Sequence, residues 1–534
     1  MKNYQLLFVG LAALGVTACD GGGVDLNVST VDNSVDNSTS NVTGGGGGTN
    51  PCAKYTDLGG VERIGSFDGR NCFYGANFVG GNNPLRVDVT IPFISGVHIF
   101  EDKLFVGESV DNRAAGVAVP QDGEGPTLTI QAGNTLAWTD AADYLLVNRG
   151  SRIIANGSPS APITLTGFTD AVTGTAGPED VQLWGGFVIN GNGITNNCTD
   201  QQRTDGTCAV VSEGQPTFYG GNNNAESSGE LRYVVIKHAG FEVATDDELN
   251  GLTLNAVGGG TVMENVQVYS TYDDGFEWFG GAASITNAVA IYVRDDSLDF
   301  SDGYVGTVDT ALAIQSFSDG NWCIELDNIG SGRSAAGQPF DLPPVTAPTV
   351  KNYTCIVSNS PTGTHGAAAG FRIRQGGRVN IENSLVYSGY ANKLAQVGNA
   401  NNRCFRPESP TTLRDMETST AANELVSVKD TVFGCEIVTS GALPGGTTFV
   451  DWLSGTGAFA FNSGNTLISD VGNANVVLLE PGTFYTAPAL RDAAGNAIPT
   501  PADGLGGVTR ADDWTSPWAY GLRAGNRGQP LWFE

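Results

Sequence analysis

The segment TYDDGFEWFGG, residues 271–281, is followed 22 residues later by VRDDSLDFSDG, residues 293–303. Aligning the two segments places Glu277 over Asp299. In both segments acidic residues alternate with large apolar residues, which is typical of a strand with one buried face. A repeat at a fixed period of this order is the signature of a solenoid, so the two segments predict equivalent strands on successive coils.

A second series of segments shares this rhythm and places Asn, or once Asp, ahead of an apolar run. The segments are VMENVQVYS, SITNAVAIY, VKNYTCIVS, VNIENSLVYS and SVKDTVFGC, and the shared positions are Asn265, Asn287, Asn352, Asn383 and Asp430. An Asn at a turn satisfies backbone groups and can hydrogen-bond to the Asn of the next coil, forming a ladder. With 74 glycines and short β-branched runs, this pattern predicts an all-β chain folded as a right-handed parallel β-helix, a solenoid.

The period also marks the limits of the solenoid. We expect the parallel β-helix to cover residues 120–440, between an N-terminal cap at 52–119 and a C-terminal cap at 441–534. Caps are required because a bare terminal coil is an exposed strand edge that pairs with other chains. The C-terminal segment loses the period, and we expect it to cover the last coil.

The chain begins MKNYQLLFVGLAALGVTACD, with a basic residue and a short apolar run before Cys19. The run is too short for a permanent membrane helix and predicts a signal peptide at residues 1–18. Its VTAC ending resembles a bacterial lipobox, which implies lipid on Cys19 and a place in the cell envelope, at the outer membrane or surface of a Gram-negative bacterium. Asp20 leaves the choice of membrane open. Residues 19–51 have almost nothing to bury, which predicts a flexible tether.

The chain carries 56 acidic and 27 basic residues, a formal charge of −29. This balance argues against nucleic acid or an anionic membrane surface as a binding partner, because both are polyanions. It favours cations, or neutral and cationic partners; a glycan and an envelope protein are the candidates. Contact with the membrane is then expected only through the lipid anchor.

Apart from Cys19, the cysteines fall as neighbours along the chain. An even number in an exported chain indicates disulfides. Sequential pairing closes short loops, so we expect Cys52–Cys72, Cys198–Cys208, Cys323–Cys355 and Cys404–Cys435. The sequence holds no CxxC spacing, which disfavours a zinc site.

Side chains alternate along a strand, so Glu277 points outward if Phe276 and Trp278 point into the core. The expected outward ladder is Thr253, Glu277, Asp299, Glu325 and Arg372. Carboxylates stacked at the strand spacing of about 4.8 Å repel unless solvent, a cation or an arginine compensates them. Three interpretations stay open: a solvated acidic face partly neutralised by Arg294 and Arg372, a cation site, or a catalytic site.

A cation site of this kind suits Ca²⁺, which takes several oxygen ligands from carboxylates and backbone groups. The candidate ligands are Asp273, Glu277, Asp295, Asp299 and Asp302. Asp274 and Asp296, nearer the turn, are available to complete the site.

Catalysis on a polysaccharide is the alternative, because carboxylates one coil apart can serve as general acid and base or nucleophile. The candidate catalytic residues are Asp273, Asp274, Asp295, Asp296 and Arg372. The order of acidic pairs, then GTHGA around His365, then FRIRQ resembles polygalacturonase-like hydrolases. His365 lies 69 residues after Asp296 and 7 before Arg372, a spacing that does not place it on the coil next to the aspartates. A calcium-dependent lyase would need an arginine or lysine base, with Arg294 or Arg372 as the candidates.

The run from NGLTLNAVGGG through TYDDGFEWFGG to VRDDSLDFSDGY resembles a family of bacterial right-handed parallel β-helix repeat lipoproteins and secreted proteins. The resemblance covers most of the chain and implies the fold and the envelope location, without implying an activity. We therefore expect a lipid-anchored envelope protein with a binding or structural role, which presents an acidic, calcium-binding face to a ligand, glycan or partner. A polysaccharide lyase or glycoside hydrolase is the alternative.

Overall fold

The computed structural model of the chain describes residues 50–532, except 215, 245–246, 359, 361, 388–402, 436, 469–503 and 510–511. The predicted signal peptide, Cys19 and all but the last two residues of the predicted tether lie outside the described residues. Residues Asn50–Glu534 form one compact unit. None of the helices in the described part is long and apolar enough to cross a membrane.

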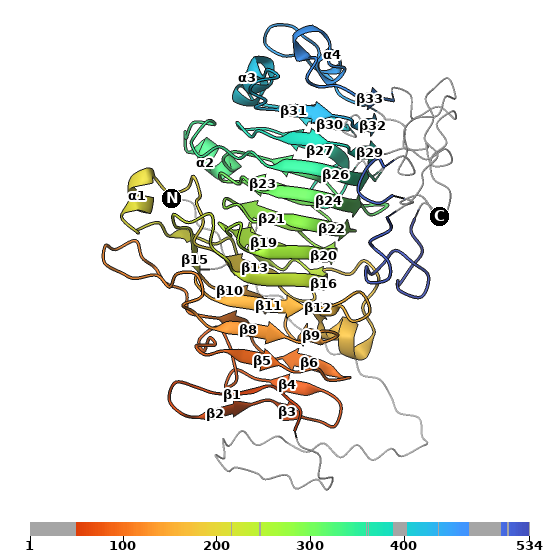
Figure 1. Ribbon diagram of the computed structural model, residues 1–534. Coiled ribbons are helices and arrows are strands. Elements are labelled where there is room, and N and C mark those ends of the chain that lie inside the picture. Colours follow the sequence, from red (N-terminus) through yellow and green to blue (C-terminus); the bar gives the residue numbers. More distant parts are fainter. Residues whose placement is uncertain are drawn as a thin grey trace, which may run out of the picture. The chain divides into compact units, whose positions relative to one another are not determined.

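Parallel strands stack on one another in two long sheets, which confirms the predicted parallel β-helix (Figure 1). The first sheet has nine strands among the described residues, each parallel to its neighbours. In stacking order they are β7 (Leu104–Val106), β10 (Leu145–Val147), β13 (Phe187–Asn190), β19 (Leu252–Asn255), β21 (Phe276–Phe279), β23 (Leu298–Ser301), β25 (Trp322–Leu326), β27 (Ala369–Ile373) and β30 (Phe405–Pro407). Each step along this list is one coil.

The second sheet supplies the rest of each coil and is also parallel, apart from its first short strand. Its strands are β3 (Ser66–Phe67), β4 (Cys72–Tyr74), β5 (Val89–Ile91), β6 (Val97–Phe100), β8 (Thr127–Ile130), β9 (Thr135–Trp138), β11 (Arg152–Asn156), β12 (Ile163–Gly167), β16 (Gly229–Ala239), β20 (Val262–Thr271), β22 (Ile285–Ile291), β24 (Thr307–Ile314), β26 (Thr349–Ile356), β28 (Asn380–Glu382), β29 (Leu385–Tyr387), β31 (Ser427–Lys429), β32 (Val432–Gly434) and β33 (Thr466–Leu467). Against β16, the long strand β20 has two unpaired residues, Ser270 and Asn265, and the gap at Asn265 recurs between β20 and β22.

The gap that recurs falls at the recurrent Asn. Asn265, Asn287 and Asn352 have φ angles of 57°, 62° and 51°, in the left-handed region that Asn tolerates better than most residues. Asn287 Nδ2 donates to Asn265 Oδ1 at 3.0 Å, and Asn383 Nδ2 donates to Asn352 Oδ1 at 2.7 Å. Thr310 holds the position on the intervening coil, with φ 69°. The predicted amide ladder is therefore confirmed for the pairs Asn265–Asn287 and Asn352–Asn383, and it marks a corner of the solenoid. Asp430, the last predicted member, has the same left-handed conformation, with φ 48°.

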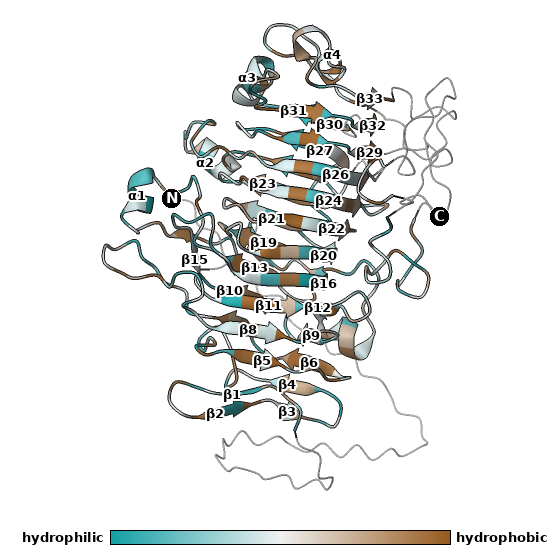
Figure 2. Cartoon of the chain, viewed as in Figure 1, coloured by the Kyte–Doolittle hydropathy of each residue, from teal (hydrophilic) through white to brown (hydrophobic). Residues whose placement is uncertain are grey.

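A continuous apolar core fills the space between the sheets. Phe276 and Trp278 are fully buried in it, as their alternation with Glu277 predicted. Trp278 packs on Phe300 of the next coil, with ring centroids 4.9 Å apart. Figure 2 shows apolar residues recurring from strand to strand along both sheets. Stacking equivalent positions therefore places aromatic rings on aromatic rings.

All four predicted disulfides are confirmed: Cys52–Cys72, Cys198–Cys208, Cys323–Cys355 and Cys404–Cys435. The eight cysteines of these bridges are buried. Each bridge joins positions that are close in the chain, and such cross-links stabilise the fold mainly by restricting the unfolded chain.

The solenoid extends beyond both predicted limits. Parallel pairing already joins β4 to β6 and β5 to β8, inside the segment predicted as the N-terminal cap, and it continues to β33. The residues before 120 had no recognisable period because their strands are short and their turns differ in length. The antiparallel pair β1 (Lys54–Thr56) and β2 (Glu62–Ile64) precedes the first parallel coil.

Only part of the predicted C-terminal cap, 441–534, is placed differently. Its first part packs on the last coils as predicted, with Trp452 of α4 (Phe449–Leu453) stacked on Phe405 of β30. The described part of the last segment, 504–532, lies along the outer side of the second sheet (Figure 1). Tyr520 N donates to Gln267 Oε1 at 2.7 Å and Trp532 Nε1 donates to the Gln315 carbonyl at 2.9 Å. The aromatic side chains of this segment pack on apolar residues that the second sheet turns outward, and this burial explains the position.

Short elements decorate the turns. They are the hairpins β14 (Val210–Val211) with β15 (Phe218–Tyr219) and β17 (Glu242–Ala244) with β18 (Asp247–Glu248), the helices α1 (Asp200–Thr204), α2 (Ser331–Ala335), α3 (Pro410–Thr418) and α4 (Phe449–Leu453), a π turn at Thr169–Thr173 and a 3₁₀ turn at Gly457–Phe459. Both hairpins and α2 belong to loops near the strands that carry the acidic residues.

We predict that Asn287→Ala destabilises the protein more than Asn287→Gly. Both variants lose the hydrogen bond to Asn265, which is worth about 1 kcal/mol. Alanine adds the strain of the left-handed conformation, about 1–2 kcal/mol, which glycine avoids. Urea unfolding followed by circular dichroism measures both free energies of unfolding. An alanine variant as stable as the glycine variant would show that the corner does not need its left-handed residue.

Candidate functional site

The outward ladder has the predicted register. Thr253 pairs with Glu277, Glu277 with Asp299, Asp299 with Glu325, and Glu325 with Arg372. We use the name acidic cluster for the carboxylates on β21, β23, β25 and the turns before β21 and β23: Asp273, Asp274, Glu277, Asp295, Asp296, Asp299 and Glu325. Its members come from three successive coils.

The acidic cluster is not a solvated face. Asp274, Glu277 and Asp296 are only 5%, 7% and 2% exposed. Glu213, in the turn between β14 and β15, contacts Glu277 through its carboxyl group. Gly214 N donates to Asp247 Oδ1 at 2.6 Å and so joins this hairpin to the β17–β18 hairpin. Loops from other coils therefore cover part of the ladder, which excludes the interpretation as simple solvated surface.

Two of the aspartates hold the turns of the solenoid. Asn250 Oδ1 accepts a hydrogen bond from Asp274 N at 3.0 Å, and Asp274 Oδ1 accepts one from Asp296 N at 2.9 Å. Asp296 Oδ1 continues the series by accepting from Trp322 N at 2.6 Å. These side chains form a second ladder in which each caps the backbone of the next coil. The sequence signal of this second ladder is the recurrence of Asn250, Asp274 and Asp296 two residues before their strands, which the sequence analysis did not connect with turn capping.

The carboxylates approach closely enough to share a cation. Three groups each offer three oxygen atoms that lie within 4.8 Å of one another. They are Asp274, Glu277 and Asp299; Asp274, Asp295 and Asp296; and Asp296, Asp299 and Glu325. Asp299 Oδ1 is buried and has no hydrogen-bond partner among the described residues. A buried carboxylate oxygen without a donor is costly unless a cation or a proton satisfies it.

Burial and mutual repulsion raise the pKa values throughout the acidic cluster. Burial, followed by the charge of Asp295, raises the pKa of Asp273 well above its ordinary range. Burial and neighbouring carboxylates also raise the pKa values of Glu277 and Asp299 well above theirs. Burial raises the pKa of Glu213 to about 7. Without a bound cation, the folded protein therefore holds protons that the unfolded chain releases.

Arginines neutralise only one end of the ladder. Arg372 binds Glu325 at 2.7 Å, and Arg374 binds Glu325 at 2.9 Å and Asp327 at 2.7 Å. Arg294, the other predicted partner, instead lies 3.7 Å from Asp319. The carboxylates on β21 and β23 are thus left without an arginine in direct contact among the described residues.

His365 corrects an expectation drawn from its spacing. The loop before β27 folds back and brings His365 Nδ1 to 3.3 Å from Asp295 Oδ2. His365, Asp273 and Asp295 form a further group whose ligand atoms lie within 4.8 Å of one another, and all three are partly exposed. The sequence spacing gave the wrong expectation because the loop that carries His365 does not follow the coil repeat and folds back to an earlier coil. Of the candidate catalytic residues, Asp273 and Asp295 are therefore the accessible pair.

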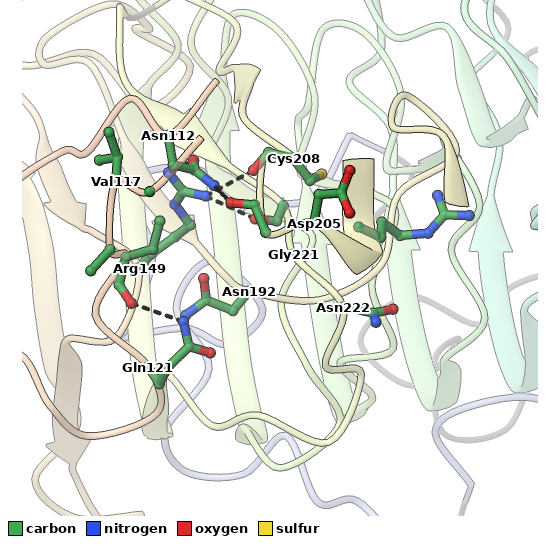
Figure 3. Close-up of a pocket in the computed structure, with 15 residues that line it drawn as sticks. Asn112, Val117, Gln121, Arg149, Asn192, Asp205, Cys208, Gly221 and Asn222 are labelled. Carbon is green, nitrogen blue, oxygen red and sulfur yellow. Dashed lines mark hydrogen bonds between the residues drawn. The ribbon is translucent and has the colours of Figure 1, made fainter. Parts of the chain in front are cut away.

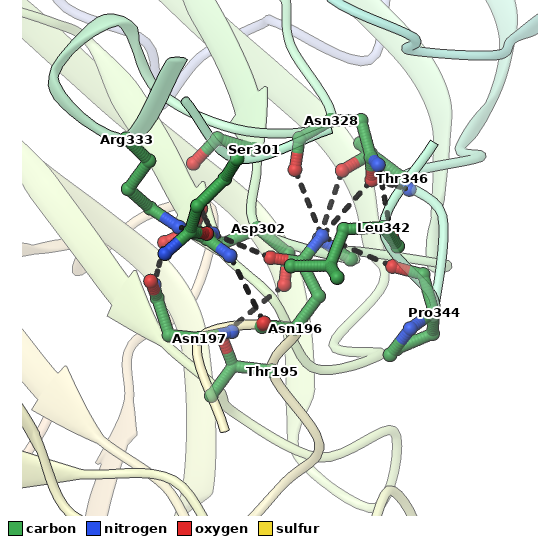
Figure 4. A network of polar contacts seen from close by, with 12 residues as sticks. Thr195, Asn196, Asn197, Ser301, Asp302, Asn328, Arg333, Leu342, Pro344 and Thr346 are labelled. Atoms are coloured by element: carbon green, nitrogen blue, oxygen red, sulfur yellow. Dashed lines mark hydrogen bonds and ion pairs between the residues drawn. The ribbon is translucent and has the colours of Figure 1, made fainter. Parts of the chain in front are cut away.

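Asp302 has different partners from the rest of the predicted calcium ligands. Arg333 of α2 binds its carboxylate at 2.7 Å, and Asn197 donates a hydrogen bond to it (Figure 4). Asn196 Nδ2 donates to Asn328 Oδ1 at 3.0 Å, which ties the α2 loop to the loop before α1. Asp302 also belongs to none of the close groups of potential ligand atoms in the described structure, so it is not a ligand of the cation site.

A separate cavity lies on the loops after β7, β10 and β13. Its volume is about 420 Å³, and Asn112, Gln121, Arg149, Asn192 and Asn222 contribute side chains to its lining (Figure 3). The Arg149 guanidinium donates to the carbonyls of Cys208 and Gly220 at 3.1 and 2.9 Å, so it braces two loops. No motif in the sequence pointed to this cavity, because its lining comes from loops without a shared pattern.

The two stacked parallel sheets define a parallel β-helix protein. Residues 117–455 match the family described as pectate-lyase like beta helix domain, and the chain belongs to this family. No curated protein matches the chain. No solved structure matches it either. The family match supports the β-helix fold. It does not test the predicted signal peptide or the predicted lipid anchor.

We predict that the free energy of unfolding falls as the pH rises from about 4 toward 7 when divalent cations are chelated. The raised pKa values mean that the folded state binds more protons than the unfolded state in this range, so raising the pH favours unfolding. Urea unfolding in EDTA at several pH values measures the slope.

The general repulsion of an acidic chain adds to the same slope, so a matched pair of variants is needed. Asp273→Asn plus Asp299→Asn should flatten the slope. The control, Glu108→Gln plus Asp341→Asn, removes two carboxylates that are 58% and 50% exposed and should not. Equal slopes in the two double variants would contradict the prediction.

Proposed function

We propose that this chain is a Ca²⁺-binding β-helix protein of the cell envelope with a binding or structural role. The observation that carries the proposal is Asp299 Oδ1, a buried carboxylate oxygen without a hydrogen-bond donor in the described structure. It stands where two of the three-carboxylate groups meet, because Asp299 belongs to both. A cation at this point would satisfy the orphaned oxygen and compensate the neighbouring charges at once.

The ligand chemistry favours calcium. Ca²⁺ accepts six to eight oxygen ligands in flexible geometry, whereas Mg²⁺ demands a near-ideal octahedron. Glu277, Asp296 and Asp299 offer carboxylate oxygens from two adjacent coils, and Glu325 adds a third coil. The predicted ligands Asp273 and Asp295 adjoin them. Because Glu277, Asp299 and Glu325 lie on adjacent parallel strands, the distance between these ligands is set by the spacing of the coils.

The sequence supplies the expected location of such a protein. The signal peptide, the lipobox-like VTAC and Cys19 support export and lipid anchoring. Four disulfides fit an oxidising compartment outside the cytoplasm. Calcium is abundant outside cells, where sites of modest affinity suffice. We further propose that the bound calcium faces an acidic glycan or an envelope protein, which the cluster alone would repel.

We predict saturable Ca²⁺ binding by the full-length protein in calorimetry, with a rise in the melting temperature. Asp295→Asn plus Asp299→Asn should weaken the affinity at least tenfold and abolish the rise, because it removes ligands from every three-carboxylate group. The control Glu108→Gln plus Asp341→Asn removes two exposed charges and should behave as the parent does. The calcium site would be rejected if the parent did not bind Ca²⁺, or if the control lost as much Ca²⁺ affinity as the Asp295→Asn plus Asp299→Asn variant.

A second candidate function is the hydrolysis or lysis of an acidic polysaccharide. The specific observation in its favour is the accessible pair Asp273 and Asp295 with His365 beside it, on a fold of the pectate-lyase-like family. Burial and Asp295 raise the pKa of Asp273 strongly, whereas the charge of His365 opposes the rise for Asp295. Such a division suits a protonated acid next to an ionised base. Arg372 is engaged by Glu325 and Glu408 and does not face this pair in the described structure.

We predict that, if the protein cleaves polygalacturonate, Asp273→Asn lowers the rate at least a hundredfold while Ca²⁺ binding falls less. Reducing ends measured together with ultraviolet absorbance of unsaturated products separate hydrolysis from lysis. Glu101→Gln, at an exposed carboxylate outside the cluster, is the control. Equal residual activity in Asp273→Asn and the parent would remove this residue from the mechanism.

A further inference from the structure

We propose that Asp273, Asp295 and His365 form a second cation position at the rim of the acidic cluster, suited to a transition metal such as Zn²⁺ rather than to Ca²⁺. The inference deepens the proposed function, since both positions belong to one cluster. The absence of a CxxC motif argued against zinc only in a cysteine-ligated form. The fold-back of the loop that carries His365 supplies a nitrogen ligand instead.

The geometry resembles one edge of a coordination polyhedron. His365 Nδ1 lies 3.3 Å from Asp295 Oδ2. Two ligands of a tetrahedral zinc ion with bonds of about 2.0–2.1 Å are separated by about 3.3 Å. Asp273 completes a triplet whose ligand atoms lie within 4.8 Å of one another. His365 Nε2 is buried and has no hydrogen-bond partner among the described residues. The imidazole ring is therefore not held in place by a hydrogen bond at Nε2.

Neighbouring groups hold the two ligands that face each other. Asn321 Nδ2 donates to Asp295 Oδ1 at 2.9 Å and to the His365 carbonyl at 3.3 Å. The Tyr272 ring meets the His365 ring edge to face, with centroids 5.0 Å apart. A hydrogen bond to the second oxygen of a ligating carboxylate orients it toward the metal. Asn321 therefore acts as a positioning residue for the Asp295–His365 edge.

Access distinguishes this position from the rest of the acidic cluster. The side chains of His365 and Asp295 are 19% and 22% exposed, whereas Asp296 is 2% exposed. An ion can enter from solvent, and water can fill the coordination sites that three protein ligands leave open. Three protein ligands with an open site are typical of reactive rather than purely structural zinc sites.

The donor sets separate the two ions. Imidazole nitrogen suits zinc, copper, nickel and iron, whereas calcium prefers oxygen donors alone. The other three close groups in the described structure consist of carboxylates only. His365 also differs from the other two histidines of the chain, His98 and His238, in its surroundings. His98 is buried and bonded to Tyr74, and His238 is buried and bonded to the Asp180 carbonyl.

The test uses the full-length protein without an affinity tag. Calorimetry measures Zn²⁺ and Ca²⁺ affinities, and the visible spectrum of bound Co²⁺ reports on nitrogen ligation. We expect His365→Ala to weaken Zn²⁺ binding at least tenfold, to change the Co²⁺ spectrum, and to leave the Ca²⁺ affinity within twofold. Glu325→Gln, at the far end of the cluster, should do the reverse. His365→Gln repeats the test with a side chain that preserves volume, and circular dichroism in EDTA verifies that each variant is folded.

Each outcome decides one of the two proposals. Equal Zn²⁺ affinity in the parent and in both His365 variants would mean adventitious carboxylate binding and would overturn the inference, whatever calcium does. Loss of Zn²⁺ and Ca²⁺ together in His365→Ala would mean a single shared site and would also overturn it. Zn²⁺ binding that depends on His365 without any Ca²⁺ binding would support the inference and reject the calcium site.

Discussion

The spacing of parallel strands, about 4.8 Å, is the constraint on which this structure depends. A chain that repeats every coil must stack each residue on its equivalent at that distance. Aromatic residues and amides gain from this arrangement, as Trp278 does on Phe300 and Asn287 on Asn265. Carboxylates lose, because like charges at this distance repel strongly when water is excluded. The acidic cluster is therefore the costly part of an otherwise favourable repeat.

The protein compensates the cluster differently along its length. At one end Asn250 donates to Glu277, and at the other Arg372 and Arg374 bind Glu325. The middle coil, that of β23, has neither, and there Asp299 Oδ1 is left without a donor among the described residues. Residual uncompensated charge in a rigid, partly covered place is the usual mark of a site that takes a cation. The repeat thus concentrates charge, and the incomplete compensation locates the proposed function.

Loops rather than strands give the site its character. The β14–β15 and β17–β18 hairpins limit access to Glu277, the α2 loop binds Asp302, and the loop before β27 delivers His365. The family match covers residues 117–455 as a β-helix domain and does not say what these loops bind. Function on a shared fold depends on such grafted segments, so the family match leaves the activity open.

The sequence by itself determined the coil, its register, the amide ladder, the disulfide pairs and the line of residues from Thr253 to Arg372. The coil, its register and the ladders repeat along the chain, so aligning the chain with itself was enough to predict them. The disulfide pairs followed from the neighbouring positions of the cysteines. Tertiary structure alone decided that the ladder is covered, that Asp274 and Asp296 cap the next coil, that His365 reaches Asp295, and that residues 504–532 lie along a sheet. The physical reason is that insertions carry no period. Their positions follow from apolar burial and hydrogen bonds between segments far apart in the chain, which no local pattern records.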